Sequence, residues 1–466
     1  MIFHPYIILG AGVTGLGAGY RLRQLGIENF IILEQHDYAG GLATTFQDEQ
    51  GFLWDIGGHV QFSHYDYFDK LMIQLLGKDG WYHHERESWI WMMERFIPYP
   101  FQNNIRHLPK EAQWMCIKGI LHNLKQSAQV LPNTFAQWIQ QSFGLGIAKL
   151  FMTPYNFKVW AYPTDLLAYN WIGERVATID LERILHNIYH EADDISWGPN
   201  NTFQFPKQGG TGAIWKKLAA EIGEQYIKYN ACVESIDSEK KVIYLKNGEQ
   251  YQYGALLSTL PINLLTDIVQ QTPQPLKEKA KGLLYSSTNV VGIGLKGQVP
   301  AHLAKKCWMY FPQEDSPFYR TTVFSNYSPN NVPNATEYWS LMTETSESTY
   351  KTVKQDTIIE DTIQGLKNSK LIDENTPIVS TWKYRAEYGY PTPSLQRDEI
   401  LNVLQPYFEN LNIFSRGRFG AWKYEVSNQD HSLMQGVEWV NRMILEIPEV
   451  TFRFPSFVNK NGGRYH

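Results

Sequence analysis

The 466-residue sequence contains only three cysteines, Cys116, Cys232 and Cys307. They are far apart and show no metal-ligand spacing, so the sequence predicts neither a disulfide framework nor a metal site, and it suits a reducing compartment. No apolar run reaches the roughly 18 residues of a membrane span, and no basic segment precedes the first predicted strand. We therefore expect a cytoplasmic protein without a membrane-spanning segment.

The chain also has no excess of positive charge. The formal net charge is −5 and the pI is about 6.2, with Lys and Arg scattered along the chain. The sequence therefore shows no electrostatic footprint for nucleic acid. An anionic ligand would have to be bound by a few Lys or Arg residues placed at its site.

The clearest motif lies between Tyr6 and Glu34, which reads as strand, glycine-rich turn, helix and second strand. Gly10, Gly12 and Gly15 follow a short apolar run in G-x-G-x-x-G spacing. The first glycine permits a tight turn, the second lets a pyrophosphate approach the backbone, and the third lets the helix lie close to the strand. Glu34 ends the second strand, where a carboxylate accepts hydrogen bonds from ribose hydroxyls and repels a 2′-phosphate. This unit predicts a dinucleotide site.

A second glycine pair, Gly40 and Gly41, follows Glu34 and resembles the extended fingerprint of FAD enzymes rather than that of NAD dehydrogenases. FAD is therefore the expected cofactor. The aromatic content of 14%, with 28 Tyr and 15 Trp, agrees with this, because a flavin, a base and a sugar all use stacking surfaces. The length corresponds to about three domains.

Periodicity predicts further elements along the chain. Helices are expected over 114–124 and 135–151, with Thr134 as a cap of the second. A C-terminal strand and glycine turn precede a helix that begins near Asn428, and its N-terminus would favour negative charge on a reduced flavin. Apolar runs predict strands, with a hairpin turn at Asn247–Gly248, over 231–236, 241–245 and 255–260.

Four strings identify a family resemblance. The stretch WDIGGHVQFSHYDYFDK from Trp54, together with IPYPFQNNI, PYNFKVWA and YEVSNQDHS, is similar to UDP-galactopyranose mutases of the eukaryotic type, and the similarity runs from Ile7 to Val458. It implies an α/β fold: an FAD-binding Rossmann-like (GR2-type) domain, an inserted helical domain and an antiparallel β-sheet substrate domain. The boundaries expected are 1–75, 205–270 and 405–466 for the FAD-binding domain, 103–204 for the helical substrate and uridine domain, and 76–102 with 271–404 for the sheet domain.

The resemblance implies an isomerase of galactofuranose biosynthesis that interconverts UDP-galactopyranose and UDP-galactofuranose. In that family N5 of reduced FAD attacks the anomeric carbon and UDP leaves. The covalent flavin–sugar adduct then allows the ring to open and reclose with no net redox change. NADPH or NADH is the expected reductant, and a UDP-sugar is the expected partner.

The resemblance also assigns roles to individual residues, beside those of the glycine motif. In the mutases, the loop that matches Gly57 to His59 lies against the flavin and shifts with its redox state. The catalytic residues expected are His59, Arg175, Asn200, Arg320 and Arg418. The substrate-binding residues expected are Gln102, Phe151, Tyr155, Asn156, Trp160, Trp308, Tyr310, Tyr327, Tyr390 and Tyr424. The cofactor-binding residues expected are Gly10, Gly12, Val13, Thr14, Gly15, Glu34, Gln35, Gly41, Leu42, Gly57, Gly58, His59, Val233, Gly417, Arg418, Asn428, Gln429 and Ser432. The residues expected to bind NAD(P)H are Arg86, Ser88 and Tyr99.

Charge patterning around Arg320 supports a diphosphate site. No Asp or Glu occurs from Ser316 to Thr336, whereas Arg320 and Tyr327 are present. A pyrophosphate carries about two negative charges and needs guanidinium and hydroxyl donors without competing carboxylates. We therefore expect Arg320 and Tyr327 to bind it with no carboxylate beside them.

Three alternatives stay open at this stage. A mutase for a related UDP-sugar would differ only in pocket shape. A flavin amine oxidase or desaturase shares the fold, but hydride abstraction usually uses an apolar tunnel, and the Arg and Tyr set argues against it. A non-catalytic binding protein similar to the Rab GDP-dissociation inhibitors needs no FAD, so the intact glycine motif weighs against it. The chain is shorter than fungal mutases around Pro333 to Glu337, and Thr153 and Gln204 replace basic residues, which leaves a homo-oligomer open.

Overall fold

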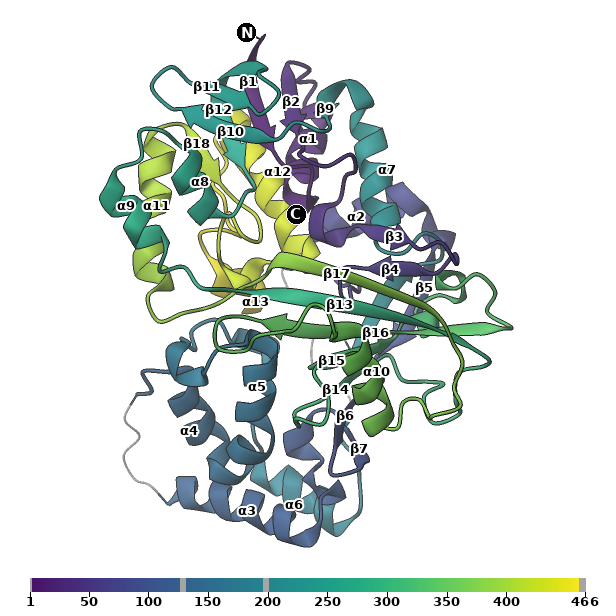
Figure 1. The fold of residues 1–466 in the computed structure, drawn as a ribbon. Coiled ribbons are helices and arrows are strands. Elements are labelled where there is room, and N and C mark those ends of the chain that lie inside the picture. Colours follow the sequence, from purple (N-terminus) through teal and green to yellow (C-terminus); the bar gives the residue numbers. More distant parts are fainter. Residues whose placement is uncertain (1, 126–130, 196–200, 461–466) are drawn as a thin grey trace.

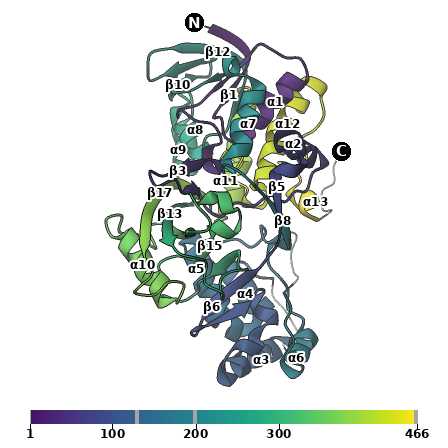
Figure 2. The same cartoon turned by 90° about the vertical axis from the view of Figure 1, so that its right-hand side faces the viewer.

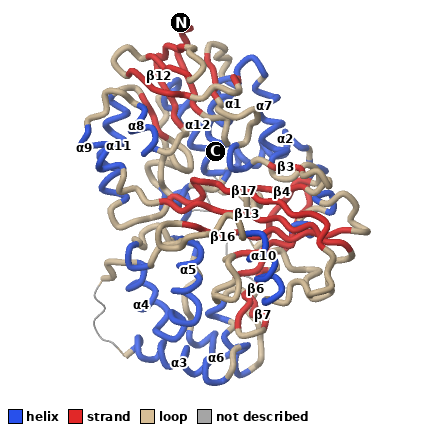
Figure 3. The backbone as a smooth tube through the Cα atoms, viewed as in Figure 1, coloured by secondary structure: helices blue, strands red, loops and turns tan. Residues whose placement is uncertain are grey.

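The computed structural model describes residues 2–125, 131–195 and 201–460. These residues form an α/β unit that contains the N-terminus, a long central sheet and a helical unit on the far side of that sheet (Figures 1 and 3). In the turned view the helical unit again lies at the end of the molecule away from the N-terminus (Figure 2). The architecture confirms the predicted FAD-type α/β fold class.

The first sheet is built around the predicted strand–helix–strand unit. β1 (Ile2–Leu9) pairs in parallel with β2 (Phe30–Leu33) and with β12 (Gln250–Ser258). The strand order is β10-β11-β12-β1-β2-β9, and β18 also pairs with β12. The remaining strands are β9 (Ile227–Lys228), β10 (Val233–Asp237), β11 (Val242–Leu245) and β18 (Ile413–Ser415).

Helices cover both faces of this sheet, which explains why its central strand is apolar throughout its second half. Ile8 faces one core cluster and Ile7 faces the other, and both side chains are fully buried. On the face of Ile8 lie α1 (Val13–Gln24), α2 (Asp66–Leu76), α7 (Gly212–Ile222) and α12 (Gln429–Leu445). On the face of Ile7 lie α8 (Ile262–Ile268), α9 (Gln274–Ala280) and α11 (Arg397–Asn410).

The central sheet has the order β17-β13-β16-β15-β14-β6-β7. All its neighbours are antiparallel except β6 and β14, which run parallel. α10 (Ile358–Asn368) packs on it through Ile358 and Leu366. The strands are β6 (Ser88–Met92), β7 (Arg95–Pro98), β13 (Tyr285–Lys296), β14 (Trp308–Tyr310), β15 (Arg320–Val323), β16 (Tyr338–Glu347) and β17 (Ile378–Pro391). Two small sheets pair β3 (Thr45–Gln47) with β4 (Leu53–Asp55) and β5 (Trp81–Glu85) with β8 (Thr202–Pro206).

The helical unit confirms one predicted helix and divides another. Thr134 caps the second predicted helix, because its hydroxyl accepts a hydrogen bond from Gln137 N at 3.3 Å. This helix breaks at Gly144 (φ +73°), where a Cβ would lie 2.4 Å from the backbone of Gly119, so close helix packing overrides the periodic pattern. The helices are α3 (Lys110–Leu124), α4 (Phe135–Ile147), a π-helical turn (Ala148–Met152), α5 (Thr153–Trp160) and α6 (Leu181–Tyr189), and α13 (Pro455–Lys460) ends the described chain.

The predicted hairpin at Asn247–Gly248 joins β11 to β12, with Gly248 at φ +86°. A search of the described helices for one long and apolar enough to cross a membrane finds no candidate.

Candidate active site

The turn after β1 leaves an open cradle at the N-terminus of α1. Gly12 is the N-cap of this helix, and a Cβ at Gly12 would meet no heavy atom of the described residues within 4 Å. At Gly15 the opposite holds, since a Cβ would lie 1.9 Å from Gly10 O. Gly41 approaches from the other side, where its Cβ would lie 3.2 Å from Gly12 Cα. The cradle and the first N–H groups of α1 fit a dinucleotide pyrophosphate.

Glu34 stands beside this cradle at the end of β2. Its side chain is buried, and Oε2 accepts a hydrogen bond from Ala11 N at 2.7 Å while Oε1 accepts one from His36 N at 2.9 Å. Ala231 N donates to Glu34 O, which brings the start of β10 and Val233 to the same edge. The two carboxylate oxygens keep further lone pairs for ribose hydroxyls.

A third segment meets the cradle from the C-terminal end of the chain. Gly417 (φ +88°) follows β18, and a Cβ there would lie 2.5 Å from the hydroxyl of Thr14. Arg418 donates from Nη1 to Ser427 Oγ at 2.9 Å and from Nη2 to Gly389 O at 2.9 Å. Asn428 then occupies the N-cap position of α12. Predicted cofactor residues from the two ends of the chain therefore lie side by side.

Replacing Gly12 by alanine is expected to lower FAD affinity by about tenfold or more. The backbone at Gly12 (φ −74°, ψ −178°) suits any residue, so the new methyl group would fill only the space assigned to the pyrophosphate. FAD content after purification and the Kd for FAD measure the effect. The Tm of the apoprotein is the control and is expected to stay within about 2 °C. A fully flavinated G12A protein would contradict the assignment.

Arg320 does have a carboxylate beside it, so the expectation of an uncontested guanidinium is wrong. Antiparallel pairing of β15 with β16 places Glu344 directly opposite Arg320. Arg320 donates from Nε to Oε1 at 2.7 Å and from Nη2 to Oε2 at 2.8 Å. Glu344 lies outside the acid-free segment 316–336, and its proximity to Arg320 depends on strand register. Alignment of the two predicted strands is the signal that could have found it.

Glu344 also reaches the predicted flavin loop. Its carboxylate accepts a hydrogen bond from Gly58 N at 2.9 Å and another from the hydroxyl of Tyr319 at 2.7 Å. The side chain is 3% exposed. Burial works to raise the pKa of Glu344, but the charge and hydrogen bonds of Arg320, with those from Gly58 and Tyr319, hold this pKa below its usual value. The group is therefore a buried carboxylate anion.

His59 follows the two loop glycines and is held neutral. Burial lowers the pKa of His59 to about 4. The negative charge of Glu344 works to raise this pKa, whereas the positive charges of Arg418 and Arg320 lower it further. The loop therefore adds no positive charge near neutral pH. These interactions bring His59, Arg320 and Arg418, all predicted as catalytic, into one electrostatic environment.

Aromatic rings form the other wall of the site. Trp160 on α5 meets Tyr424 edge-on at 4.8 Å and Tyr390 at 5.8 Å between ring centroids. The guanidinium of Arg175 lies 5.6 Å from the ring of Tyr424 and that of Arg418 lies 4.9 Å from the ring of Tyr390. Arg175 Nη1 and Trp160 Nε1 are buried donors with no partner among the described residues. Because such groups are costly to bury unpaired, they indicate a site for a ligand with acceptor atoms.

A second aromatic group continues from α5 toward β14. Tyr155 stacks on Phe151 at 5.1 Å and meets Tyr310 edge-on at 5.3 Å. Trp308 Nε1 donates to the hydroxyl of Tyr310 at 2.5 Å. Parallel stacking surfaces of this kind suit a base.

Two predicted substrate residues use their amide N–H groups within the helical unit: Gln102 donates to Ala177 O and Asn156 donates to Met152 O. Tyr327 is fully buried, with Phe203 and Phe205 5.3 and 5.2 Å from its ring. Asn200, predicted to contact the sugar, lies outside the described residues.

The residues predicted to bind NAD(P)H are neighbours. The guanidinium of Arg86 lies 5.1 Å from the ring of Tyr99, and Tyr99 N donates to Ser88 O at 3.1 Å. The ring of Tyr99 is 5.4 Å from that of Tyr310, which connects this group to the aromatic wall.

One buried cluster near the start of α12 was not predicted. His64 Nδ1 lies 2.7 Å from Asp430 Oδ2, and the rings of His64 and His431 are 4.6 Å apart. Burial works to raise the pKa of Asp430, but the two imidazoles hold it well below its usual value. His64 is far from Asp430 and His431 in the sequence, so no local motif indicated this cluster.

The fold, the glycine cradle and the acid at the end of β2 define a flavoprotein of the amine oxidoreductase class. Residues 13–414 match the family model of flavin containing amine oxidoreductases. The probable flavin-containing monoamine oxidase A of Dictyostelium discoideum is 24% identical over 282 residues, which span 56% of this chain and 58% of that relative. A crystal structure of a putative protoporphyrinogen oxidase from Exiguobacterium sp. 255-15 superposes with a TM-score of 0.72 at 14% identity over 95% of this chain and 99% of that one, and so shares the fold.

A nearer likeness is to a crystal structure of a reduced UDP-galactopyranose mutase. The two chains are 46% identical and superpose with a TM-score of 0.96, over 100% of this chain and 99% of the other. The chain belongs to the UDP-galactopyranose mutase family, within the flavin containing amine oxidoreductases. The resemblance seen in the sequence is thereby confirmed.

Proposed function

We propose that the protein is a UDP-galactopyranose mutase, which interconverts UDP-galactopyranose and UDP-galactofuranose with FAD in the reduced state. The observation that carries the proposal is the site itself: Arg175 lies against Tyr424 and Arg418 against Tyr390. Arg320 shares the carboxylate of Glu344 with Gly58 N of the loop predicted to face the flavin. The likeness to a reduced mutase over the whole chain supports it.

The cradle at Gly12, the carboxylate of Glu34 and the turn at Gly417 would hold FAD. When bound and reduced, the flavin supplies the nucleophile for the anomeric carbon of the sugar. The residues of the protein bind the UDP-sugar and orient it relative to the flavin. Arg320 still has its Nη1 edge available beside Glu344, so it can donate to the diphosphate and retain the departing UDP for reattachment.

Binding energy at the remote UDP group can be used to position the sugar. Stacking on Phe151 and Tyr155 would fix the uracil, and the guanidinium groups would fix the diphosphate. The anomeric carbon is then held in a defined place relative to the cofactor. The entropy that the sugar must lose to reach this position is offset by binding of the UDP group and no longer adds to the barrier of the reaction.

Glycosidase-type chemistry is not favoured. It requires two carboxyl groups that flank the scissile bond, with one free to donate a proton. Glu344 already accepts from Gly58, Tyr319 and twice from Arg320, which fills its four acceptor positions. The covalent chemistry therefore falls to the cofactor.

Amine oxidation is the main rival within the shared family. It is not favoured because the site presents arginine and tyrosine groups that suit a sugar diphosphate. Oxygen consumption with amines would reveal it, whereas we expect none. A colourless purified protein would instead favour a non-catalytic binding role.

NADPH is expected to reduce the purified protein without a partner. Arg86→Ala is expected to raise the NADPH concentration for half-maximal reduction by about tenfold, because it removes a cation beside Tyr99. Anaerobic stopped-flow bleaching of the flavin measures this. Arg95→Ala, at the exposed first residue of β7, is the matched control and should behave as wild type. Bleaching by dithionite alone would refute the assignment.

The proposal includes a cytoplasmic location and a role in galactofuranose biosynthesis. The three cysteines support the location, since all of them are unpaired thiols, as in a reducing compartment.

A further inference from the structure

The short turn Tyr424–Val426 is connected to two arginines that are predicted as catalytic. Its middle carbonyl, Glu425 O, accepts a hydrogen bond from Arg175 Nη2 at 2.6 Å. The hydroxyl of Ser427 donates to the first carbonyl of the turn at 3.0 Å and accepts from Arg418 Nη1 at 2.9 Å. The backbone of this turn therefore contacts one guanidinium directly and the other through one hydroxyl.

Arg175 needs an anchor because it reaches the site from a separate segment. It ends the 3-10 turn Gly173–Arg175, in the part of the chain that follows α5. An arginine side chain has several rotatable bonds, so its guanidinium presents a defined donor to a ligand only when it is held. The carbonyl of Glu425 holds Nη2, while the buried Nη1 has no partner among the described residues and is a donor left for a ligand.

A third arginine, Arg397 on α11, holds the side chain of Glu425. Its Nη1 and Nη2 donate to the two carboxylate oxygens at 2.8 and 3.0 Å, so the planar guanidinium and the planar carboxylate meet in two parallel hydrogen bonds. The side chains of Arg397 and Glu425 are 2% and 12% exposed, so solvent screens this pair only weakly. Arg397 Nε also donates to Asp398 at 2.8 Å. The carboxylate of Glu425 is therefore held at two points by an arginine that is itself fixed.

The C-terminal helix α13 holds the backbone of the same residue. Asn459 Nδ2 donates to Glu425 O at 2.9 Å, beside the bond from Arg175. A carbonyl oxygen has two lone pairs, and these two donors occupy both. The carbonyl therefore cannot turn away from Arg175 without losing a second hydrogen bond, and the carboxylate cannot move without losing the bonds from Arg397.

We propose that Arg397 is a positioning residue, which fixes the guanidinium of Arg175 through Glu425. The inference rests on the proposed function, in which Arg175 acts on the bound UDP-sugar. Weakening the pair between Arg397 and Glu425 would loosen the turn, and Glu425 O would then hold Arg175 less precisely. A small misplacement of a catalytic group can cost up to about a hundredfold in rate, so turnover should fall although every predicted site residue is still present.

The test compares Arg397→Lys in two backgrounds, wild type and Arg175→Ala, with FAD-loaded, dithionite-reduced protein. Lysine keeps the charge but cannot make two parallel hydrogen bonds to Glu425. In wild type we expect R397K to lower kcat for UDP-galactofuranose by about tenfold. In the R175A background it should change kcat by less than about twofold, because the group that Arg397 positions is then absent. Equal losses in the two backgrounds would indicate a merely structural role and overturn the inference.

The midpoint potential of the flavin is a second measurement, and it needs no mutase activity in either background. Glu425 lies shortly before Asn428, the N-cap of α12, whose N-terminus is predicted to favour negative charge on a reduced flavin. A displaced Arg175 guanidinium would stabilise the reduced flavin less. R397K should therefore lower the potential by about 15 mV, which corresponds to about a threefold change in the equilibrium constant. In R175A the same substitution should leave the potential unchanged.

Arg385→Lys is the matched control, because it makes the same substitution at an arginine on strand β17 whose Nε donates to Glu347 at 2.8 Å. Its kcat and potential should equal those of wild type. If R397K does not retain FAD, Glu425→Asp takes its place. The shorter side chain keeps the charge but cannot meet both nitrogens of Arg397 with the turn in place, so the same changes are expected.

Wild-type kcat and potential in R397K, or loss of FAD from both R397K and E425D, would overturn the inference. Conversion of UDP-galactofuranose by wild type is measured first. Its absence would refute the proposed function, while the potentials would still decide whether Arg397 acts through Arg175.

Discussion

Arg320→Ala is expected to weaken UDP binding by about a hundredfold, or about 3 kcal/mol, and to lower kcat/KM by at least as much. Arg320 is predicted to donate charge-assisted hydrogen bonds to the diphosphate, and truncation of such a group leaves the bound anion without its partner. Isothermal titration with UDP and the conversion assay measure the two effects. An affinity within about threefold of wild type would refute the assignment.

The Glu344 ion pair dictates the controls for this variant. Arg320→Ala alone leaves the buried carboxylate of Glu344 without its cation, and this by itself lowers the stability of the protein. The double variant R320A/E344Q removes that penalty, so it should recover thermal stability and flavin content but not UDP affinity. Arg385→Ala, on strand β17 of the same sheet and paired with Glu347, should bind UDP as wild type does.

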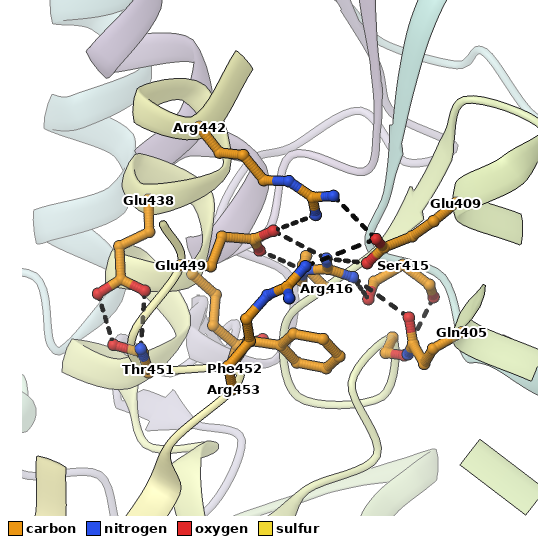
Figure 4. A network of polar contacts seen from close by, with 12 residues as sticks. Gln405, Glu409, Ser415, Arg416, Glu438, Arg442, Glu449, Thr451, Phe452 and Arg453 are labelled. Atoms are coloured by element: carbon orange, nitrogen blue, oxygen red, sulfur yellow. Dashed lines mark hydrogen bonds and ion pairs between the residues drawn. The ribbon is translucent and has the colours of Figure 1, made fainter. Parts of the chain in front are cut away.

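Glu449→Ala is expected to lower the free energy of unfolding by about 3 kcal/mol. Figure 4 shows the network around Arg416, which is fully buried with Glu449. Arg416 donates from Nε and Nη2 to Glu449 and from Nη2 to Glu409, and its guanidinium lies 3.9 Å from the ring of Phe452. Arg442 also donates to Glu449, at 2.8 Å. Loss of the carboxylate leaves two buried or half-buried cations under-compensated.

This network also positions the flavin turn, because Arg416 directly precedes Gly417 and Arg418. We therefore expect E449A to lose FAD more readily than wild type as urea is raised. Glu399→Ala is the matched control. Glu399 lies on α11, as Glu409 does, and pairs with Lys279 of α9, but its side chain is 73% exposed, so its loss should leave the urea midpoint close to that of wild type. Equal urea midpoints for E449A and E399A would contradict the importance of the buried network.

Local features of the fold could be predicted from the sequence. The glycine motif, β2 and the Thr134 cap depend on residues within a few positions of one another, and all are present. The break at Gly144 could not be predicted, because it depends on the backbone of Gly119 on another helix.

The polar organisation of the site was harder to predict for a related reason. Glu344 meets Arg320 only through strand register, and Glu449 meets Arg416 only after α12 has returned the chain to β18. Charge counts within a short window cannot include such partners. The predicted arginines and tyrosines lie close together, and their roles stay predictions, whereas the carboxylate beside Arg320 was not predicted.

The most direct test of the central claim is to incubate FAD-loaded protein with UDP-galactofuranose and to separate the nucleotide sugars by chromatography. The dithionite-reduced protein is predicted to form UDP-galactopyranose with many turnovers per flavin, and the oxidised protein is predicted to form none. Absence of the pyranose product with fully reduced flavin, or equal rates in the two redox states, would contradict the account.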